Sequence, residues 1–198
     1  MGLNLPNAIT LSRLFCVPLV VWLILVDRMG AAFWVSLAAG LSDAVDGIIA
    51  KRYRMVTVLG GYLDPIADKA LLVCVYVALA HQAHLPVWLV ILVVFRDALI
   101  IGGALLFLTL TQALSMKPLM VSKVNTVMQL TLAVEVLASA AFGIDDSAVR
   151  PALIFGVAAT TLVSGAAYVV NWTRLAAEME LTEAEGDSAA TEPGEDDE

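Results

Sequence analysis

The chain has 198 residues, 60% of them hydrophobic, and its mean hydropathy is +0.87. This composition excludes an ordinary soluble domain and indicates a membrane protein. The formal net charge of −8 belongs mainly to one end, because ten of the 19 acidic residues lie from Glu178 to Glu198, where Lys and Arg are absent.

Six apolar stretches approach the ~20 residues that a helix needs to cross a bilayer. They cover residues 9–26, 31–50, 58–80, 86–110, 124–142 and 152–170, and charge, Gly or Pro separates them. The first has no clear small-residue cleavage site, so we expect an uncleaved helix. The sequence thus predicts an all-α, polytopic membrane protein with six transmembrane helices in residues 1–174. The acidic tail, residues 175–198, lacks apolar periodicity and is predicted to be disordered.

Basic residues predict the orientation of these spans. If the spans alternate, one side of the membrane receives Lys51, Arg52, Arg54, Lys117, Lys123 and Arg174. The other side receives Arg28 and Arg150. We therefore expect both termini in the cytoplasm, and an integral protein of a bacterial inner membrane whose functional residues face the cytoplasm.

The segment before the first span reads NLPNAITLSR. Pro6 can begin a helix, and Asn7, Thr10 and Arg13 then share one face at a spacing of three. The simplest interpretation is an interfacial helical turn from which Arg13 reaches the lipid head groups.

Four aspartates interrupt the second and third apolar stretches: Asp43, Asp46, Asp64 and Asp68. On helices, their spacings of three and four place each pair on one face. Charged groups at membrane depth are costly, and four acids without enough nearby cations indicate a bound divalent metal ion. Carboxylate oxygens suit Mg²⁺ or Mn²⁺.

Small residues accompany these acids. Gly47, Ala50 and Gly60 leave the helix surface bare, which would let a bulky ligand approach the backbone. Close packing of membrane helices explains small residues equally well, but it leaves the acids unexplained. Pro65 predicts a local kink, which either turns the Asp64 carboxylate toward the first pair or has no function.

Residues 43–68 resemble the signature of the CDP-alcohol phosphatidyltransferase family, D-x₂-D-G-x₂-A-R-x₈-G-x₃-D-x₃-D. Every fixed position agrees except Lys51, where the family usually has Arg. Arg52 follows directly, so either residue would meet a phosphate. The opening NxPNxxTxxR also recurs in this family beside the nucleotide site. Two later fragments, FRDALIIGG and KPLMVSKVNTVMQL, resemble the CMP-forming cardiolipin synthases in particular, and the phosphatidylglycerophosphate synthases are a close second.

The resemblance implies the CDP-alcohol phosphotransferase fold, a homodimer, and two Mg²⁺ or Mn²⁺ ions. The metal ligands would be Asp43, Asp46, Asp64 and Asp68. Asp68 would also be the catalytic base. Contacts to the CDP-lipid would come from Asn7, Thr10, Gly47, Ala50, Lys51, Arg52 and Gly60.

The expected reaction joins CDP-diacylglycerol to phosphatidylglycerol, giving cardiolipin and CMP, and glycerol-3-phosphate is the alternative acceptor. We hypothesise that Arg96, Lys117 and Lys123 hold the acceptor phosphate, because they are cationic and are expected near the cytoplasmic side. Simpler explanations do not involve the acceptor: Arg96 and Asp97 would form an ion pair that neutralises itself, and the lysines would anchor the protein at the membrane interface.

Two other classes of protein share parts of this pattern. Intramembrane acids with metal also occur in cation transporters, which often contain paired repeats. The D-x₂-D-G pattern occurs once, and the acids cluster toward one membrane face without a path across. A non-catalytic scaffold would not need the complete acid set.

Overall fold

The structure is a computed structural model. It describes the backbone of residues 5–53, 58–111 and 120–191, and the side chains of residues 15–42, 69–103, 120–174 and 177. Over these residues the chain forms six helices and no strand, which confirms the all-α prediction. The helices are α1 (Leu5–Leu25), α2 (Met29–Tyr53), α3 (Val58–His81), α4 (Val87–Thr111), α5 (Met120–Phe142) and α6 (Val149–Thr191).

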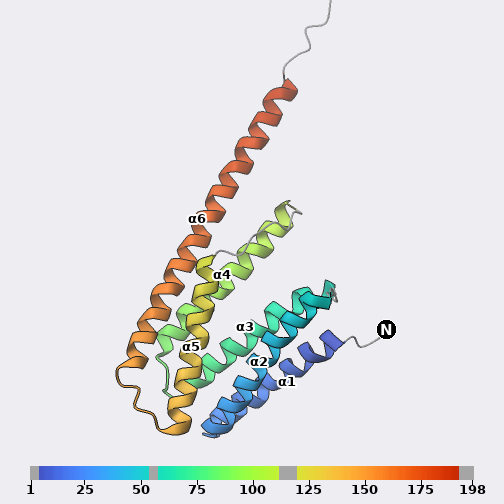
Figure 1. Cartoon of the computed structure of the whole chain (residues 1–198). Helices are drawn as coiled ribbons and strands as arrows, with labels where there is room; N and C mark the ends of the chain where they lie inside the picture. Colours follow the sequence, from blue (N-terminus) through green and yellow to red (C-terminus); the bar gives the residue numbers. More distant parts are fainter. Residues whose placement is uncertain (1–4, 54–57, 112–119, 192–198) are drawn as a thin grey trace, which may run out of the picture.

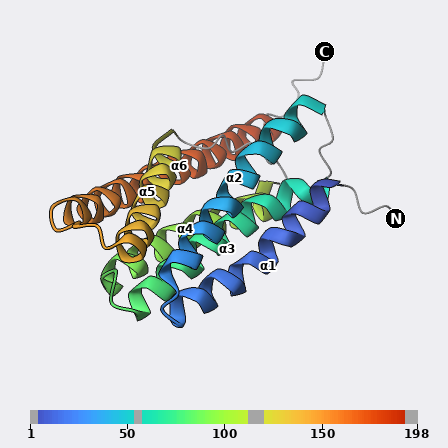
Figure 2. The same ribbon diagram turned by 60° about the horizontal axis from the view of Figure 1, so that its bottom comes forward.

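The helices run alternately up and down, so α1 begins and α6 ends toward the same end of the bundle (Figures 1 and 2). We call this end the N-terminal end. The opposite end, which holds the turns after α1, α3 and α5, is the turn end. Neighbouring helices pack in a ring in the order α1, α2, α5, α6, α4, α3 and back to α1, and a contact between α3 and α5 crosses the ring. Each helix therefore packs against its two neighbours in the ring, and α3 and α5 also pack against each other.

The three turns at the turn end share one device. Each contains a residue with positive φ: Asp27 at 59°, Ala83 at 58° and Gly143 at 66°. After α5, the N–H of Gly143 donates to the carbonyl of Ser139 at 2.9 Å, which caps the helix. Glycine suits this position because a left-handed backbone conformation costs it nothing. These turns end the helices sharply and keep the connections at this end short.

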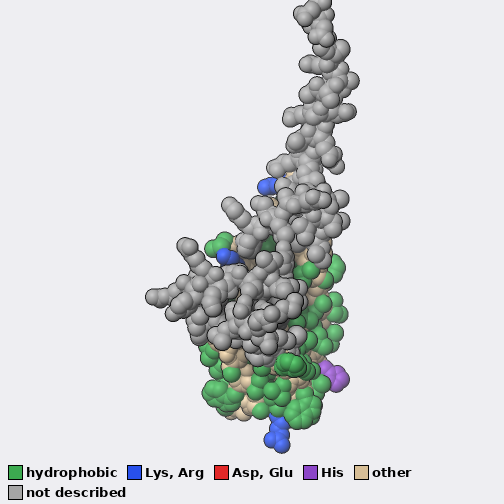
Figure 3. All heavy atoms as spheres, turned by 90° about the vertical axis from the view of Figure 1, so that its right-hand side faces the viewer, with side chains coloured by type: hydrophobic (Ala, Val, Ile, Leu, Met, Phe, Trp, Pro, Cys, Tyr) green, Lys and Arg blue, Asp and Glu red, His purple; other side chains and the backbone are tan. Residues whose placement is uncertain are grey.

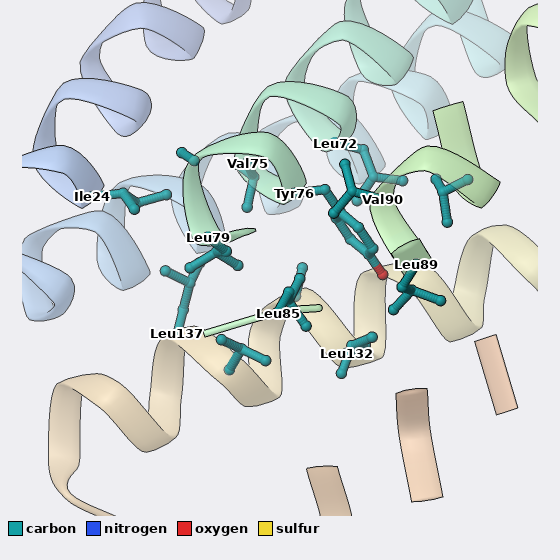
Figure 4. Packing of buried hydrophobic residues seen from close by; sticks show 14 of the residues in the cluster. Ile24, Leu72, Val75, Tyr76, Leu79, Leu85, Leu89, Val90, Leu132 and Leu137 are labelled. Atoms are coloured by element: carbon teal, nitrogen blue, oxygen red, sulfur yellow. The ribbon is translucent and has the colours of Figure 1, made fainter. Parts of the chain in front are cut away.

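The buried apolar core fills the half of the bundle next to the turn end. Figure 4 shows part of it, with Ile24, Leu72, Val75, Tyr76, Leu79, Leu85, Leu89, Val90, Leu132 and Leu137 labelled. Tyr76 is fully buried, and its hydroxyl donates to the backbone carbonyl of Gln129 on α5 at 2.9 Å. Since lipid tails are as apolar as leucine, these side chains hold membrane helices together by close packing rather than by escape from water.

The outside of the bundle is also apolar. Large exposed hydrophobic side chains occur on all six helices, including Phe15, Trp22, Trp34, Val77, Phe95, Val127 and Phe155. Figure 3 shows apolar side chains over much of the part of one face that is not grey, with basic side chains toward its two ends. Two helical stretches within the described residues, Met120–Phe142 and Val149–Arg174, are long and apolar enough to cross a membrane. Exposed apolar surface on every helix favours a lipid environment.

The last helix runs into the segment that the sequence assigns to the acidic tail. α6 continues to Thr191 and projects beyond the other helices (Figure 1), and the disorder of residues 175–198 stays a prediction. This segment is rich in Ala, Leu, Met and Glu, which are strong helix formers, so local propensity can extend the helix without packing. Acidity and the lack of apolar periodicity exclude a buried face, but they do not exclude a solvated helix.

Candidate active site

The four predicted metal ligands lie at the N-terminal end of the bundle. Asp43 and Asp46 are in the last part of α2, and Asp64 and Asp68 are in the first part of α3. The two helices reach the same end of the bundle (Figure 2). The side chains of these four residues lie outside the described set, so their gathering around shared ions remains a prediction.

The chemistry of this donor set fits Mg²⁺ or Mn²⁺, because carboxylate oxygens are the ligands that hard divalent cations prefer. Among the side chains that the structure describes, no group of three or more His, Cys, Asp or Glu is placed to hold a metal ion. The signature aspartates lie outside the described side chains, and their role as metal ligands stays a prediction.

The residues predicted to contact the CDP-lipid also lie toward the N-terminal end. Asn7 and Thr10 are in the first turns of α1, and Gly60 is in the first turn of α3. The end of α2 carries Gly47, Ala50, Lys51 and Arg52. Their surroundings fall outside the described side chains, as does Lys117 altogether, so these roles remain predictions.

The interior of the bundle changes from apolar to polar at a similar level on four helices. The last core residues toward the N-terminal end are Leu72 on α3, Val93 on α4, Leu132 on α5 and Val157–Ala158 on α6. The next inward positions are polar: Lys69, Arg96, Asp97, Asn125, Gln129, Thr161 and Ser164. The polar half therefore begins next to the segment of α3 that carries Asp64 and Asp68.

Asp97 is the centre of a charged group that joins α3 to α4. Its two carboxylate oxygens each accept a hydrogen bond of 2.9 Å from Lys69 Nζ, and Oδ1 also accepts one of 2.7 Å from Arg96 Nη1. The exposed fractions of the side chains are 29% for Lys69, 3% for Arg96 and 6% for Asp97. We call these three residues the ion triad. It contains two cations and one anion, so it keeps one positive charge inside the bundle.

Arg96 connects the ion triad to α5 and α6. Its Nη2 donates to Ser122 Oγ at 2.8 Å and to Ser164 Oγ, and its guanidinium carbon lies 5.9 Å from the centroid of the Tyr168 ring. At this distance the ring face attracts the cation. Among the described residues, the buried Nε of Arg96 has no hydrogen-bond partner. This N–H can therefore donate to another acceptor.

A second polar group lies between α5 and α6. Thr160 and Thr161 both donate to Asn125 Oδ1 at 2.9 Å. Gln129 follows one turn later on α5 and is fully buried. The side-chain amide of Gln129 and Asn125 Nδ2 have no protein partner among the described residues. Buried amides in an apolar bundle are costly, so this group must serve packing specificity, bound water or a ligand.

An apolar cavity of about 310 Å³ lies between α2, α3 and α5. Its lining is almost entirely hydrophobic and includes Phe33, Leu37, Leu72, Leu130 and Val134. Among the described residues that line it, Lys69 is the one with a charged side chain. The volume is at the lower end of the roughly 300–1,000 Å³ typical of ligand pockets. The cavity therefore offers an apolar chamber whose cationic wall belongs to the ion triad.

Of the three residues that the sequence grouped as acceptor ligands, the structure describes Arg96 and Lys123, and their shared role stays a prediction. Arg96 is buried, Lys123 is exposed at the start of α5, and the described contacts of Arg96 go to Asp97, Ser122, Ser164 and Tyr168. The Arg96–Asp97 pair is present. Sequence reasoning missed Lys69 and Ser164. Lys69 gave a signal, because a cation inside an apolar stretch is a functional candidate in its own right.

Comparison with known proteins identifies the family of this chain. Residues 3–176 match the CDP-alcohol phosphatidyltransferase family, which covers the helical bundle and the whole signature. The chain belongs to the CDP-alcohol phosphatidyltransferase family. The predicted family is thereby confirmed, and its membership is consistent with a membrane-embedded enzyme of phospholipid synthesis.

Individual relatives carry two kinds of name. The chain is 34% identical over 191 residues to a chloroplastic CDP-diacylglycerol–glycerol-3-phosphate 3-phosphatidyltransferase of Oryza sativa subsp. japonica, covering 87% of this chain and 58% of that protein. It is 32% identical over 181 residues to the human cardiolipin synthase (CMP-forming), covering 83% and 60%. It is 31% identical over 172 residues to a CDP-diacylglycerol–glycerol-3-phosphate 3-phosphatidyltransferase of Rickettsia typhi, covering 83% and 94%.

The coverage differs between these relatives. The chain spans 58% and 60% of the length of the rice and human proteins, whereas it spans 94% of the Rickettsia protein. The names of these relatives describe two reactions, which differ in the acceptor alcohol. The comparisons therefore establish the family and leave the acceptor alcohol to be argued from the site.

Proposed function

We propose that this chain transfers a phosphatidyl group from CDP-diacylglycerol to phosphatidylglycerol, giving cardiolipin and CMP. The observation that carries the proposal is the complete acid signature, Asp43 to Asp68, within a chain that matches the family over residues 3–176. The ion triad next to α3 adds a buried positive charge, which suits anionic lipid substrates.

The chain's own residues divide the work of this reaction. A hydroxyl oxygen of the acceptor attacks the phosphorus that bears the diacylglycerol, and the bond from that phosphorus to the CMP oxygen breaks. Asp68 takes the hydroxyl proton, and CMP leaves with the bonding electron pair. Lys51 or Arg52 donates hydrogen bonds to the phosphate oxygens. Two Mg²⁺ or Mn²⁺ ions, when bound by the four aspartates, supply charge neutralisation at the pyrophosphate.

The apolar cavity supports a lipid substrate rather than a soluble one. It lies between the helices that carry the two acid pairs. Its wall includes Gly40 of α2, three residues before Asp43, and Lys69 of α3, which directly follows Asp68. We propose that it receives part of an acyl chain of the CDP-lipid while the nucleotide lies at the acids. A head group beside a cationic wall and a tail in an apolar chamber match the two parts of such a ligand.

The bundle is proposed to cross the membrane six times with its N-terminal end in the cytoplasm, and to form a homodimer. Apolar surface on all six helices and the alternating arrangement support the spans. The predicted excess of Lys and Arg at the N-terminal end supports the orientation. A bacterial inner membrane is the proposed location. The relatives come from a plant, an animal and a bacterium, so their sources do not decide between membranes.

The acceptor is proposed to bind through Arg96, Lys117 and Lys123. The unpartnered Nε of Arg96 supports this role, because it leaves a buried donor for a phosphate oxygen. The second candidate acceptor is glycerol-3-phosphate, which is favoured by the Rickettsia relative whose length the chain nearly spans.

One experiment separates these functions. Purified protein receives CDP-diacylglycerol and Mn²⁺ with either phosphatidylglycerol or glycerol-3-phosphate, and mass spectrometry identifies the lipid product while CMP release is measured. We expect cardiolipin and CMP in the first reaction. Phosphatidylglycerophosphate in the second reaction alone would transfer the assignment to the second candidate. Absence of CMP release with both acceptors, in protein that is folded and supplied with metal, would reject the transferase.

A further inference from the structure

We propose that Asp97 is a positioning residue, which fixes the acid-bearing segment of α3 through Lys69. The proposal rests on the proposed function, because the acids that it positions are those of the transferase site. Asp97 itself lies on α4, 29 residues beyond Asp68, and carries no part of the family signature. Its role follows from the contacts of the ion triad.

The contacts make Asp97 a clamp between two helices. Both of its oxygens accept hydrogen bonds from Lys69, and one of them also accepts from Arg96. Charge-assisted bonds of this kind are the strong ones, and a carboxylate held from two directions has little freedom. Arg96 is in turn held by Ser122 of α5 and Ser164 of α6. Through Asp97 and Arg96, Lys69 is therefore held in place relative to α4, α5 and α6.

Lys69 and the two acids of α3 lie on one short helical segment, so they move together. Lys69 and Asp68 are consecutive residues of α3, and Asp64 is five residues from Lys69, or ~7.5 Å at 1.5 Å per residue. The apolar core holds α3 from Leu72 onward, on the other side of Lys69. A rotation or slide of the α3 end would move both carboxylates together. Reacting groups tolerate displacements of only about 1 Å before rates fall by about 100-fold.

A different explanation must be separated from this one. Asp97 also offsets one of two buried cations, so its loss leaves Lys69 and Arg96 together without an anion. The variant Asp97→Asn alone would then lower the folded yield for reasons of charge, whatever the acids do. A second variant removes this ambiguity. Lys69→Met combined with Asp97→Asn restores the single positive charge of the wild type but abolishes the link between α3 and α4.

The test compares these variants by three measurements: folded yield in detergent, kcat for CMP release, and Mn²⁺ binding without lipid, followed through the spectrum of free Mn²⁺. We expect Asp97→Asn to reduce the folded yield. We expect the double variant to recover that yield, yet to lose at least tenfold in kcat and tenfold in Mn²⁺ affinity. Asp97→Glu, which keeps the link, should stay closer to the wild type in both.

A matched control lies at the turn end, where Asp146 pairs with Arg150. Asp146→Asn also removes an ion pair between charged side chains, and it should leave kcat and Mn²⁺ affinity within twofold of the wild type. A double variant that recovers its yield and keeps both values within twofold would overturn the proposal. A double variant that does not fold would also overturn it, because Asp97 would then be needed by the fold itself. The Mn²⁺ measurement needs no turnover, so the role of Asp97 is judged separately from the transferase assignment.

Discussion

The two halves of the bundle follow different rules. The half next to the turn end has an apolar interior around Tyr76, short turns and close packing. In the other half the same helices turn charged and amide side chains inward, among them Asp97 and Gln129. Membrane helices gain little from burying apolar groups against each other rather than against lipid, so the first half supplies shape. Polar groups are costly to bury in a membrane, and this cost supports the proposal that the polar half contains the active site.

The sharpest way to test this division is to remove a charge from the polar half. Asp68→Asn keeps the size of the side chain but removes the proposed base and one proposed metal ligand. We expect turnover to fall by about 10²–10⁴-fold, while the helical content and the binding of CDP-diacylglycerol stay measurable. The measurement is CMP release beside a CDP-lipid binding assay. Normal turnover in this variant would remove the base assignment.

The corresponding change in the apolar half is Leu132→Ala. Leu132 is fully buried in the core, so its truncation should cost about 2–5 kcal/mol of stability. We expect a lower midpoint of thermal unfolding in detergent, with kcat per folded molecule unchanged. A loss of kcat without a loss of stability would contradict the division between the two halves.

Arg96→Ala tests the border between the halves. It leaves Lys69 and Asp97 as a neutral pair, and it removes the buried guanidinium proposed to meet the acceptor phosphate. We expect the Michaelis constant for the acceptor to rise about tenfold, which corresponds to roughly 1.4 kcal/mol, and the constant for CDP-diacylglycerol to rise less. Lys117→Ala and Lys123→Ala test the same grouping. The opposite order of effects would reject it.

The smallest expected effect belongs to Tyr76→Phe. The variant keeps the ring in the core and removes the hydroxyl that donates to the Gln129 carbonyl. Hydrogen bonds between membrane helices contribute about 0.6 kcal/mol on average, so we expect a small drop in thermal stability and normal turnover. The measurement is the midpoint of thermal unfolding in detergent, with the wild type and Tyr76→Phe compared under the same conditions. A large loss of activity would contradict the assignment of Tyr76 to the part of the bundle that only supports the fold.

Much of the fold could be predicted from local patterns. The predicted stretches 58–80 and 124–142 became α3 and α5 with ends shifted by a few residues at most, because charge, Gly or Pro bounds each apolar run. The tail shows how two local signals can differ, since its charge argues against packing while its Ala and Glu content favours the helix that α6 forms up to Thr191. The order of this segment stays a prediction.

The site was harder to predict because its contacts join distant residues. Lys69 and Asp97 are 28 residues apart, and only the register of α3 against α4 brings them together. A sequence without a structure offers no measure of that register. The Arg96–Asp97 pair was visible because the two are neighbours in the chain. Ser164 gave no comparable signal, since a serine among Gly and Ala is typical of helix packing.

The crossing of the ring by α3 and α5 has a consequence for permeation. The hydroxyl of Tyr76 meets α5 within the buried apolar core, which also includes Leu79, Leu89 and Leu132. Over the described residues, this packed core fills the bundle between the ion triad and the turn end. Vesicles that contain the protein should therefore hold a gradient of Mn²⁺ or protons as long as empty vesicles do.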